Sequence, residues 1–230
     1  SFKSLEKTLD IVLNGVATPT PAGKLTGEGL LPEMATEGDN TRYFINNFLT
    51  LFAALVGQAS LTEARWIKSG FKFTYLAIKK AFRWKNMPAT VTIDNETLKF
   101  DNLVLACTGL GENVGGGMKM FPGAIPFDLN GFPVLIASEI GTFTILRLLS
   151  SIRSGKHVNH EKVDLHHGIQ HIEVETDSPM ICDADSIYPA YTPVALDFIP
   201  NAYQFIVDSA FVESELQRKK AMESKQFPSK

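Results

Sequence analysis

Two aspartates separated by one residue are the strongest candidates for chemistry in this sequence. Asp183 and Asp185 flank Ala184 in the segment ICDADS. A carboxylate beside a hydroxyl group can orient that group and accept its proton, which is the role of a general base. The same pair is also typical of a solvated turn in which neither carboxylate has a chemical role. The spacing alone leaves both interpretations open.

A run of three glycines is the second feature. Gly115, Gly116 and Gly117 lie in the segment TGLGENVGGGMKMFPGA, directly after a predicted strand. Glycine allows positive φ angles and a close approach of the backbone to a ligand or to another chain segment. The segment lacks the Gly-Lys-Ser/Thr of a phosphate-binding loop and the spacing of a dinucleotide fingerprint. It predicts either a loop beside a ligand cleft or a tight hairpin between strands.

All five histidines fall within fifteen residues, which raises the question of a metal site. They are His157, His160, His166, His167 and His171. Clustered imidazoles are typical ligands of zinc or nickel, but this spacing matches no standard metal motif. Neighbouring side chains of a strand point to opposite faces, so His166 and His167 would diverge. The pattern favours a solvated segment over a histidine metal-binding protein.

The segment 63–85 has helical periodicity with two distinct faces. Apolar residues that we expect to face the core recur at helical spacing: Ile67, Phe71, Tyr75, Ile78 and Phe82. Basic residues take another face: Arg65, Lys68, Lys72, Lys79 and Arg83. This basic face is either an ordinary solvated surface or a surface through which the domain binds an anionic membrane.

The composition is that of an ordinary globular chain. The 230 residues are 44% apolar and 20% charged, with a net charge of −3. These values exclude a disordered chain and a surface that is basic throughout. Two cysteines, Cys107 and Cys182, are too few for a disulfide scaffold and are typical of a reduced, cytosolic-type protein. No apolar run approaches the ~20 residues of a membrane span.

Strand-like segments outnumber helical ones. Alternation and β-branched or aromatic content predict strands over 42–50, 132–138, 169–176, 194–199 and 203–207, and a hairpin over 89–109 that turns at Asp94-Asn95. Helices are predicted over 4–15, 63–85 and 139–155, and a linker with edge strands over 16–40. No βαβ alternation occurs, so the expected fold is mainly β: an antiparallel β-sandwich with two inserted helices.

The glycine segment and its surroundings resemble the C-terminal domain of the soluble bacterial diacylglycerol kinases, the YegS-like lipid kinases related to sphingosine kinases. The resemblance rests on LVLACTGLGENVGGGMKMFPGAIPFD, which has the family's strand, polar loop, triple glycine and acidic loop. The segments RYFINNFLTLFAALV and SGKHVNHEKV and the closing strands from Ile172 to Val207 also match in order. The likeness covers about 40–207.

The resemblance implies a domain organisation. Residues 26–208 would form the β-sandwich domain of a lipid-kinase or NAD-kinase-like fold, and 209–230 a polar helical tail. Residues 1–25 would be a remnant helix and linker from a missing N-terminal α/β nucleotide-binding domain. The Gly-Gly-Asp-Gly-Thr loop with which the family binds ATP does not occur in the sequence. We therefore expect no cofactor bound tightly to this chain, and Mg²⁺ and ATP only in the intact protein.

The resemblance also assigns roles to site residues. Asp185 takes the position of the family's proposed general base for the lipid hydroxyl, and Asp183 that of its acidic partner. Asp128 lies where the family has an acidic loop that helps to hold a divalent metal. The loop Gly115–Gly117 would help to form the cleft.

Several positions depart from the family pattern. Leu51 and Ala53 replace a glycine and an aspartate, and Ala184 replaces a glycine. The loop at Asp128 also has fewer carboxylates than its counterpart. These departures keep open a second function, that of a non-catalytic lipid-binding or regulatory module that kept the fold without kinase chemistry.

The function implied by the resemblance is that of a diacylglycerol kinase-like lipid kinase, which transfers a phosphoryl group from ATP to a lipid hydroxyl. This chain would be its lipid-substrate domain and inactive alone. The expected partners are the lipid substrate, an anionic membrane surface and the missing N-terminal domain, with a homodimer as a further option and no nucleic acid. The expected location is cytoplasmic with peripheral membrane association.

Overall fold

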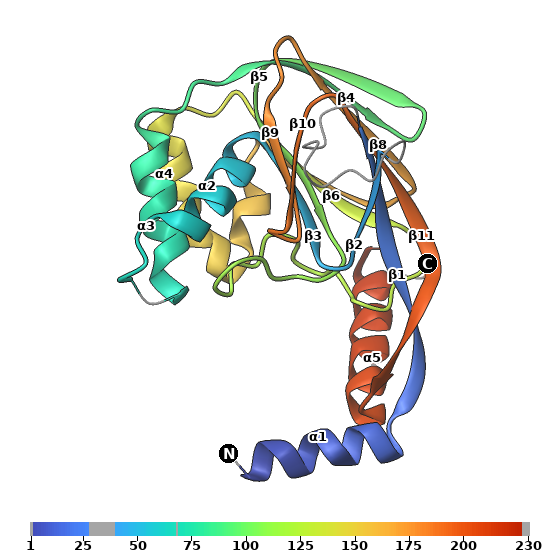
Figure 1. The fold of residues 1–230 in the computed structure, drawn as a ribbon. Helices are drawn as coiled ribbons and strands as arrows, with labels where there is room; N and C mark the ends of the chain where they lie inside the picture. The colour runs from blue at the N-terminus through green and yellow to red at the C-terminus, as the bar shows by residue number, and fades with distance from the viewer. Residues whose placement is uncertain (1, 28–39, 68, 227–230) are drawn as a thin grey trace.

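An antiparallel sheet forms the centre of the structure (Figure 1). The computed structural model describes residues 2–27, 40–67 and 69–226. The strands of this part of the chain are β1 (Val16–Gly27), β2 (Thr41–Phe44), β3 (Asn47–Thr50), β4 (Met87–Ile93), β5 (Glu96–Gly109), β6 (Phe132–Ser138), β7 (Val163–Ile169), β8 (His171–Thr176), β9 (Ile181–Ala184), β10 (Tyr188–Tyr191) and β11 (Val194–Val207). Their order is β10-β9-β3-β5-β4-β8-β11-β1-β2, while β6 pairs with β5 and with β7.

The sheet curls so that aromatic side chains from distant strands meet. The ring centroids of Phe44 in β2 and Phe132 in β6 lie 5.8 Å apart, and those of Phe132 and Phe198 in β11 lie 5.0 Å apart. All three side chains are buried. Strands β2 and β11 lie near one end of the strand order, whereas β6 pairs with β5 away from that end. Burying their rings together brings the two halves of the sheet face to face, as in a sandwich. The predicted fold class is confirmed.

Three helices pack on one outer face of the sheet (Figure 1). They are α2 (Leu51–Thr62), α3 (Ser69–Ala81) and α4 (Thr142–Ser151), the last continued by the 3₁₀ turns η2 (Ile152–Ser154) and η3 (Lys156–Asn159). The sequence predicted two inserted helices and did not separate α2 from the strand before it. The reason is that α2 carries no charged residue and is buried on several sides, so it lacks the polar face of a surface helix.

Helix α3 is shorter than predicted and faces the other way. It ends at Ala81 and begins at Ser69, so Arg65 and Arg83 lie outside it, and Lys68 lies outside the described residues. The aromatic stripe predicted to face the core is exposed, whereas Leu76, Ala77 and Ala81 are buried. Small side chains let α3 approach α2 and the sheet closely, which the large rings would prevent.

Strands β1 and β11 form one long ribbon. They pair along their whole length, from Val16 opposite Val207 to Gly27 opposite Val194. The prediction of two separate strands over 194–207 is therefore wrong. The predicted linker with edge strands over 16–40 is a strand as far as Gly27, and 28–39 lie outside the described residues. The predicted domain boundary at residue 25 falls inside β1.

The prolines of β1 fit the ribbon for a physical reason. Pro21 coincides with a shift of register between Thr20 and Ala22, where the ladder is interrupted. Pro19 lies in the part of β1 that has β11 as its partner but no β2, since β2 pairs only with Gly23 to Thr26. A proline without an N–H group is tolerated at both kinds of position.

The other strand predictions are mostly confirmed. The hairpin of β4 and β5 turns at Asp94-Asn95, and Asp94 Oδ1 accepts hydrogen bonds from the backbone of Gln170 and His171. Strand β6 has the predicted bounds. Strand β7 was missed, because its sequence VDLHHGI offers little apolar alternation.

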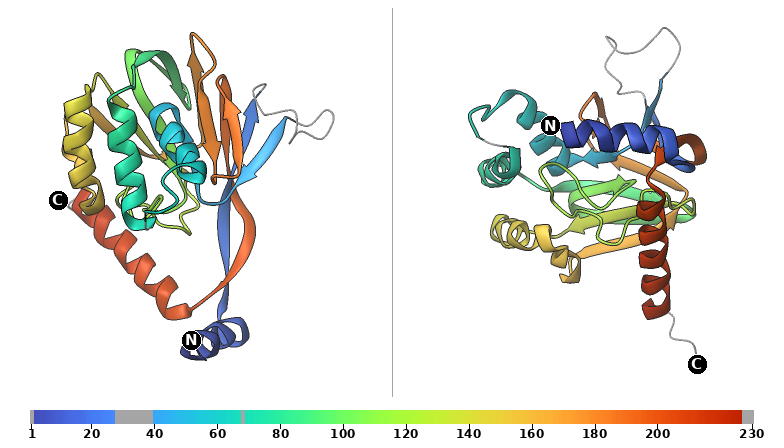
Figure 2. Two further views of the ribbon diagram at one scale, coloured as in Figure 1. Left: turned by 60° about the vertical axis from the view of Figure 1, so that its left-hand side comes forward. Right: turned by 90° about the horizontal axis from the view of Figure 1, so that it is seen from below.

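The two terminal helices lie near the lower end of the ribbon (Figure 2). They are α1 (Phe2–Asn14) and α5 (Ser209–Gln226). Helix α5 turns back along the sheet, where Arg218 Nη2 lies 2.8 Å from Glu112 Oε1 and Lys219 Nζ 2.8 Å from Asp128 Oδ1. These two ion pairs hold the segment that was predicted as a polar, fraying tail against the rest of the domain. Residues 227–230 lie outside the described chain. No described helix is both long and apolar enough to cross a membrane.

Candidate functional site

An apolar cavity lies between the sheet and the three helices on its outer face. It encloses about 510 Å³ of empty space, including open solvent at its mouth. Its walls come from α2, α3, α4 with η2, the neighbouring strands and the segment after β5: Leu49, Phe52, Ala53, Val56, Gly57, Phe73, Ala77, Leu105, Val114, Met118, Met120, Leu149 and Ile152. These walls fit hydrocarbon and offer no side chain that could bind a charged group. A second cavity of about 490 Å³ shares five of these residues and is lined also by His157.

Asp183 lies beside this cavity. It is fully buried in β9, and neither of its carboxylate oxygens has a hydrogen-bond partner of good geometry among the described residues. A Cβ atom built on Gly57, which lines the cavity, would lie 3.2 Å from Asp183 Oδ2. Burial raises the pKa of Asp183 to about 6, although Gln58 and Ser186 lie close enough to oppose the shift. Asp183 can therefore both hold and release a proton near neutral pH.

Asp185 has a different environment. It follows β9 with a positive φ of 54°. Its carboxylate accepts three backbone hydrogen bonds, from Ile45 N to Oδ2 (2.7 Å) and from Asn46 N and Asn47 N to Oδ1 (3.0 and 2.8 Å). Asp185 N also donates to Asn47 O (3.0 Å). The side chain thereby fixes the turn between β2 and β3, which explains why the predicted single strand over 42–50 is broken there.

The glycine turn borders the cavity. Val114 and Met118, which flank it, exchange backbone hydrogen bonds of 2.8 and 3.1 Å, and both line the cavity. Gly115 and Gly117 have φ angles of 32° and 82°. A Cβ atom on Gly115 would lie 2.8 Å from the ring of Phe73 in α3, so this position needs glycine for space as well as for conformation. The two interpretations of the glycines coincide: a tight hairpin turn beside a cavity.

Asp128, the predicted metal ligand, is engaged elsewhere. Its Oδ1 accepts hydrogen bonds from Lys219 Nζ (2.8 Å) and Asn130 N (3.1 Å). In the part of the chain that the structure describes, no three His, Cys, Asp or Glu side chains are grouped as metal ligands. Magnesium prefers several oxygen ligands. One aspartate paired with a lysine does not fit a magnesium site within this chain.

The histidines are spread over several elements. Buried His157 lies 3.1 Å from Met120 O through Nε2, and burial lowers its pKa. His171 lies between Asp197 (2.7 Å) and Glu173 (3.2 Å). These contacts give both residues structural roles without a metal.

The predicted membrane-facing cations do not form one helical face. Lys72 lies on α3, Arg65 precedes the helix and Arg83 follows it. Lys79 Nζ lies 2.8 Å from Glu63 Oε2, and hydrogen bonds from Lys79 and Lys80 lower the pKa of Glu63 to about 2.

The local sequence pattern did not predict most of the cavity. Phe52, Val56 and Gly57 belong to α2, which has no clear helical period. The signal that could have found them is the uncharged stretch Leu51–Thr62, in which small residues alternate with large ones.

Fold and site together define a β-sandwich domain with an apolar cavity and a buried carboxylate beside it. The family of the YegS C-terminal NAD kinase beta sandwich-like domain matches residues 53–207. Because this match spans most of the chain, the chain belongs to that family and is a module of kinase-family proteins.

Solved structures show the same fold. The chain is similar to a putative diacylglycerol kinase from Bacillus anthracis str. Sterne with a TM-score of 0.63 and 16% identity, over 91% of this chain and 63% of that one. A second diacylglycerol kinase from that organism gives 0.57 and 14%, over 90% and 60%. The chain thus spans less than two thirds of the length of these proteins. A comparison with curated proteins finds no match.

Proposed function

We propose that this chain is the lipid-substrate domain of an ATP-dependent lipid kinase of the diacylglycerol kinase type. The observation that carries the proposal is the apolar cavity with the buried carboxylate of Asp183, whose pKa burial raises to about 6, beside it. The apolar walls of the cavity suit an acyl chain. Asp183, which lies behind Gly57, would contact the hydroxyl group at the head of that chain. The names of the similar kinases from Bacillus anthracis support the same reaction.

In the proposed reaction the lipid hydroxyl oxygen forms a bond to the γ-phosphorus of ATP. The bond between that phosphorus and the β,γ-bridging oxygen breaks, ADP leaves, and the hydroxyl proton passes to a carboxylate. Mg²⁺ and ATP would be held by parts of the intact protein outside this chain. The chain's own residues bind the acyl group, exclude water and accept the proton.

The sequence assigned the base to Asp185, and this assignment stays a prediction. The geometry favours Asp183 as the base and Asp185 as a positioning residue. Both oxygens of Asp185 already accept backbone hydrogen bonds, whereas those of Asp183 have no partner of good geometry among the described residues and burial raises its pKa to about 6.

The test is turnover of diacylglycerol in detergent micelles by the intact protein. Asp183→Asn should lower kcat by about 10²–10⁴-fold with little change in KM for ATP. Exposed Asp177→Asn is the matched control and should keep the parent's kcat. Near-normal turnover by Asp183→Asn, together with loss of turnover in Asp185→Asn, would show that Asp185 is the general base. No phosphorylation of any lipid hydroxyl by the parent would contradict the proposed function.

A non-catalytic lipid-binding module is the second candidate. The observation that favours it is the engagement of Asp128 by Lys219 and of Asp185 by backbone amides, which leaves few free carboxylates. Binding of a fluorescent diacylglycerol without turnover would support this candidate. Binding should weaken in Val56→Trp, which fills the cavity, while circular dichroism checks that this variant folds.

A further inference from the structure

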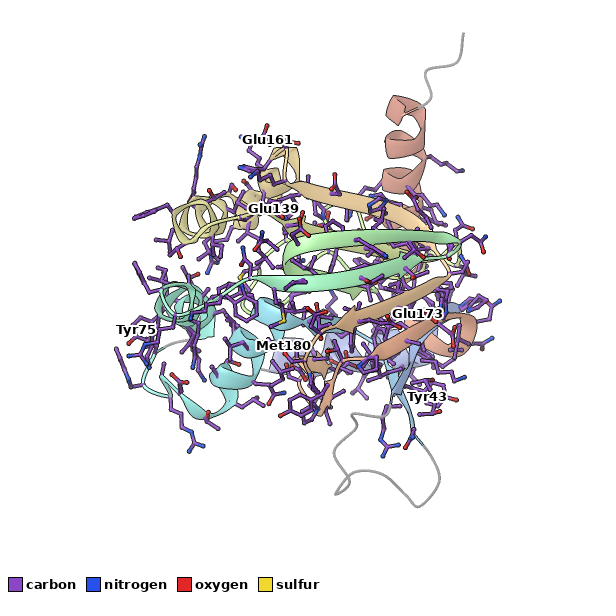
Figure 3. The ribbon with its side chains drawn as sticks, turned by 90° about the horizontal axis from the view of Figure 1, so that it is seen from above. Tyr43, Tyr75, Glu139, Glu161, Glu173 and Met180 are labelled. Carbon is purple, nitrogen blue, oxygen red and sulfur yellow. The ribbon has the colours of Figure 1, made fainter. Side chains whose placement is uncertain are left out.

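A stripe of large apolar side chains on the outer side of α3 is exposed. Along and just beyond α3 the residues lie four, three and four positions apart, which places them on one side of the helix. Together with two neighbours they form what we call the aromatic face: Trp66, Phe71, Tyr75, Ile78, Phe82 and Phe143. Trp66 is 81% exposed, Phe71 73% and Phe143 83%. Figure 3 shows Tyr75 on the side of α3 that is turned away from the sheet.

One ring contact and one hydrogen bond connect parts of the aromatic face. The rings of Trp66 and Tyr75 meet edge to face with centroids 6.1 Å apart. Thr142 Oγ1 donates a hydrogen bond to Ala81 O (3.2 Å), which holds the start of α4, and so Phe143, beside the end of α3. Contiguous exposed apolar patches are uncommon on monomers and mark interaction sites.

Basic residues concentrate around this face, although the whole chain is acidic. The two stretches that carry the aromatic face and its border, 64–85 and 140–153, contain nine of the 22 Lys and Arg residues and none of the 25 Asp and Glu residues, although Glu63 and Glu139 lie directly beside them. Arg153 lies over the ring of Phe71, 5.9 Å from its centroid. Lys79 and Lys80 pair with Glu63, whereas Lys72 and Arg83 make no ion pair with an acid among the described residues.

We propose that the aromatic face is a docking surface for an anionic membrane. Aromatic rings favour the level of the lipid headgroups, and the surrounding cations attract anionic lipids. This charge complementarity favours a membrane over a second copy of the chain, which would bring two basic surfaces together. Of the cations predicted from the sequence, Lys72 lies on α3 and Arg83 just after it, beside the docking surface, and the rings predicted to be core would enter the interface.

The proposal rests on the proposed function, because docking would deliver the substrate. Phe73 and Ala77 on the inner side of α3 line the apolar cavity, so only α3 separates the cavity from the docked face. A lipid leaving the membrane would have a short path to Asp183.

The experiment measures co-sedimentation of the 230-residue chain with vesicles of phosphatidylcholine, with and without phosphatidylglycerol, in the absence of nucleotide. The parent should bind only the vesicles with phosphatidylglycerol. Binding should weaken as the salt concentration rises from about 0.1 to about 1 M. Trp66→Ala/Phe71→Ala/Phe82→Ala should bind at least about tenfold more weakly, and Lys72→Glu/Arg83→Glu should lose its preference for phosphatidylglycerol.

The matched control removes exposed apolar side chains elsewhere. Leu9→Ala/Leu13→Ala on α1 should bind as the parent does. Trp66 also reports directly: its emission should shift to the blue on docking, and this shift should vanish in Trp66→Phe. Loss of binding in the α1 variant alone, or equal binding by parent and aromatic variant, would overturn the proposal. Because no turnover is measured, this failure is distinguishable from failure of the kinase assay in micelles.

Discussion

The two neighbouring aspartates show how much the environment of a residue decides. Asp183 and Asp185 are two positions apart, yet one is buried without a hydrogen-bond partner of good geometry and the other is held by three backbone amides. A spacing of two residues cannot reveal this difference, because it depends on Gly57 and on the turn at Ile45. The sequence therefore located the acidic pair but not the difference between the two environments.

Asp183 should make folding stability depend on pH. Its folded pKa of about 6 exceeds the 3.8 of an unfolded aspartate. The folded state therefore holds the proton more tightly, and the free energy of unfolding falls between pH about 4 and about 6. At about 1.4 kcal/mol per pH unit, the loss above pH 6 is at most about 3 kcal/mol. Asp183→Asn should be about 1–3 kcal/mol more stable than the parent at pH 8 and little changed at pH 4.

Urea unfolding at several pH values measures this effect. Exposed Asp177→Asn serves as the control and should follow the parent at every pH. The same slope of stability against pH in the parent and in Asp183→Asn would contradict the raised pKa of Asp183.

At the scale of elements, the glycine turn depends on its contact with α3. Gly115→Ala would place a Cβ atom 2.8 Å from the ring of Phe73 and would retain a φ of 32°. We expect a loss of about 1–3 kcal/mol in the free energy of unfolding. At Gly117 φ is 82°, but no atom lies within 4 Å of an added Cβ. Gly117→Ala should therefore lower the free energy of unfolding by only about 1 kcal/mol. Equal losses in chemical denaturation would show that the contact with Phe73 is unimportant.

Helix α5 offers a second prediction at this scale. Arg218 binds both Glu112 and the carbonyl oxygen of Ala124 (3.1 Å), and Glu112 is largely buried. Arg218→Ala should lower the free energy of unfolding by about 1–2 kcal/mol, because it leaves Glu112 with fewer partners. Exposed Lys220→Ala is the control. If the thermal melting curves of the two variants coincide, the contacts of Arg218 do not stabilise the packing of α5 on the domain.

The elements that the sequence predicted well are those with a clear period. Strand β6 and the hairpin at Asp94-Asn95 have strong apolar or turn signals, and both are as predicted. Helix α2 has no polar face, and the large rings of α3 suggested a core face that its small residues provide instead. In each case tertiary packing, which the local pattern does not contain, decided the outcome. The cavity was missed for the same reason, since its walls come from those helices.

At the scale of the whole molecule, nucleotide binding is the feature we expect to be weak. Backbone amides of a glycine-rich loop commonly supply the phosphate site, and the family's Gly-Gly-Asp-Gly-Thr loop does not occur in these residues. Titration calorimetry with Mg-ATP should detect no micromolar affinity for this chain. Micromolar binding would show that the domain carries a nucleotide site of its own.

The ribbon of β1 and β11 has a consequence for synthesis on the ribosome. Among the described strands β1 is the first to be made, but its partner along the whole ribbon, from Val194 to Val207, is the last. Until then β1 can pair only with the four residues of β2. Contacts between such distant segments form slowly, because a long loop must close first. The sandwich is therefore completed only when translation of the domain is nearly finished, and a nascent chain that stops before β11 leaves the edge of β1 open to other strands.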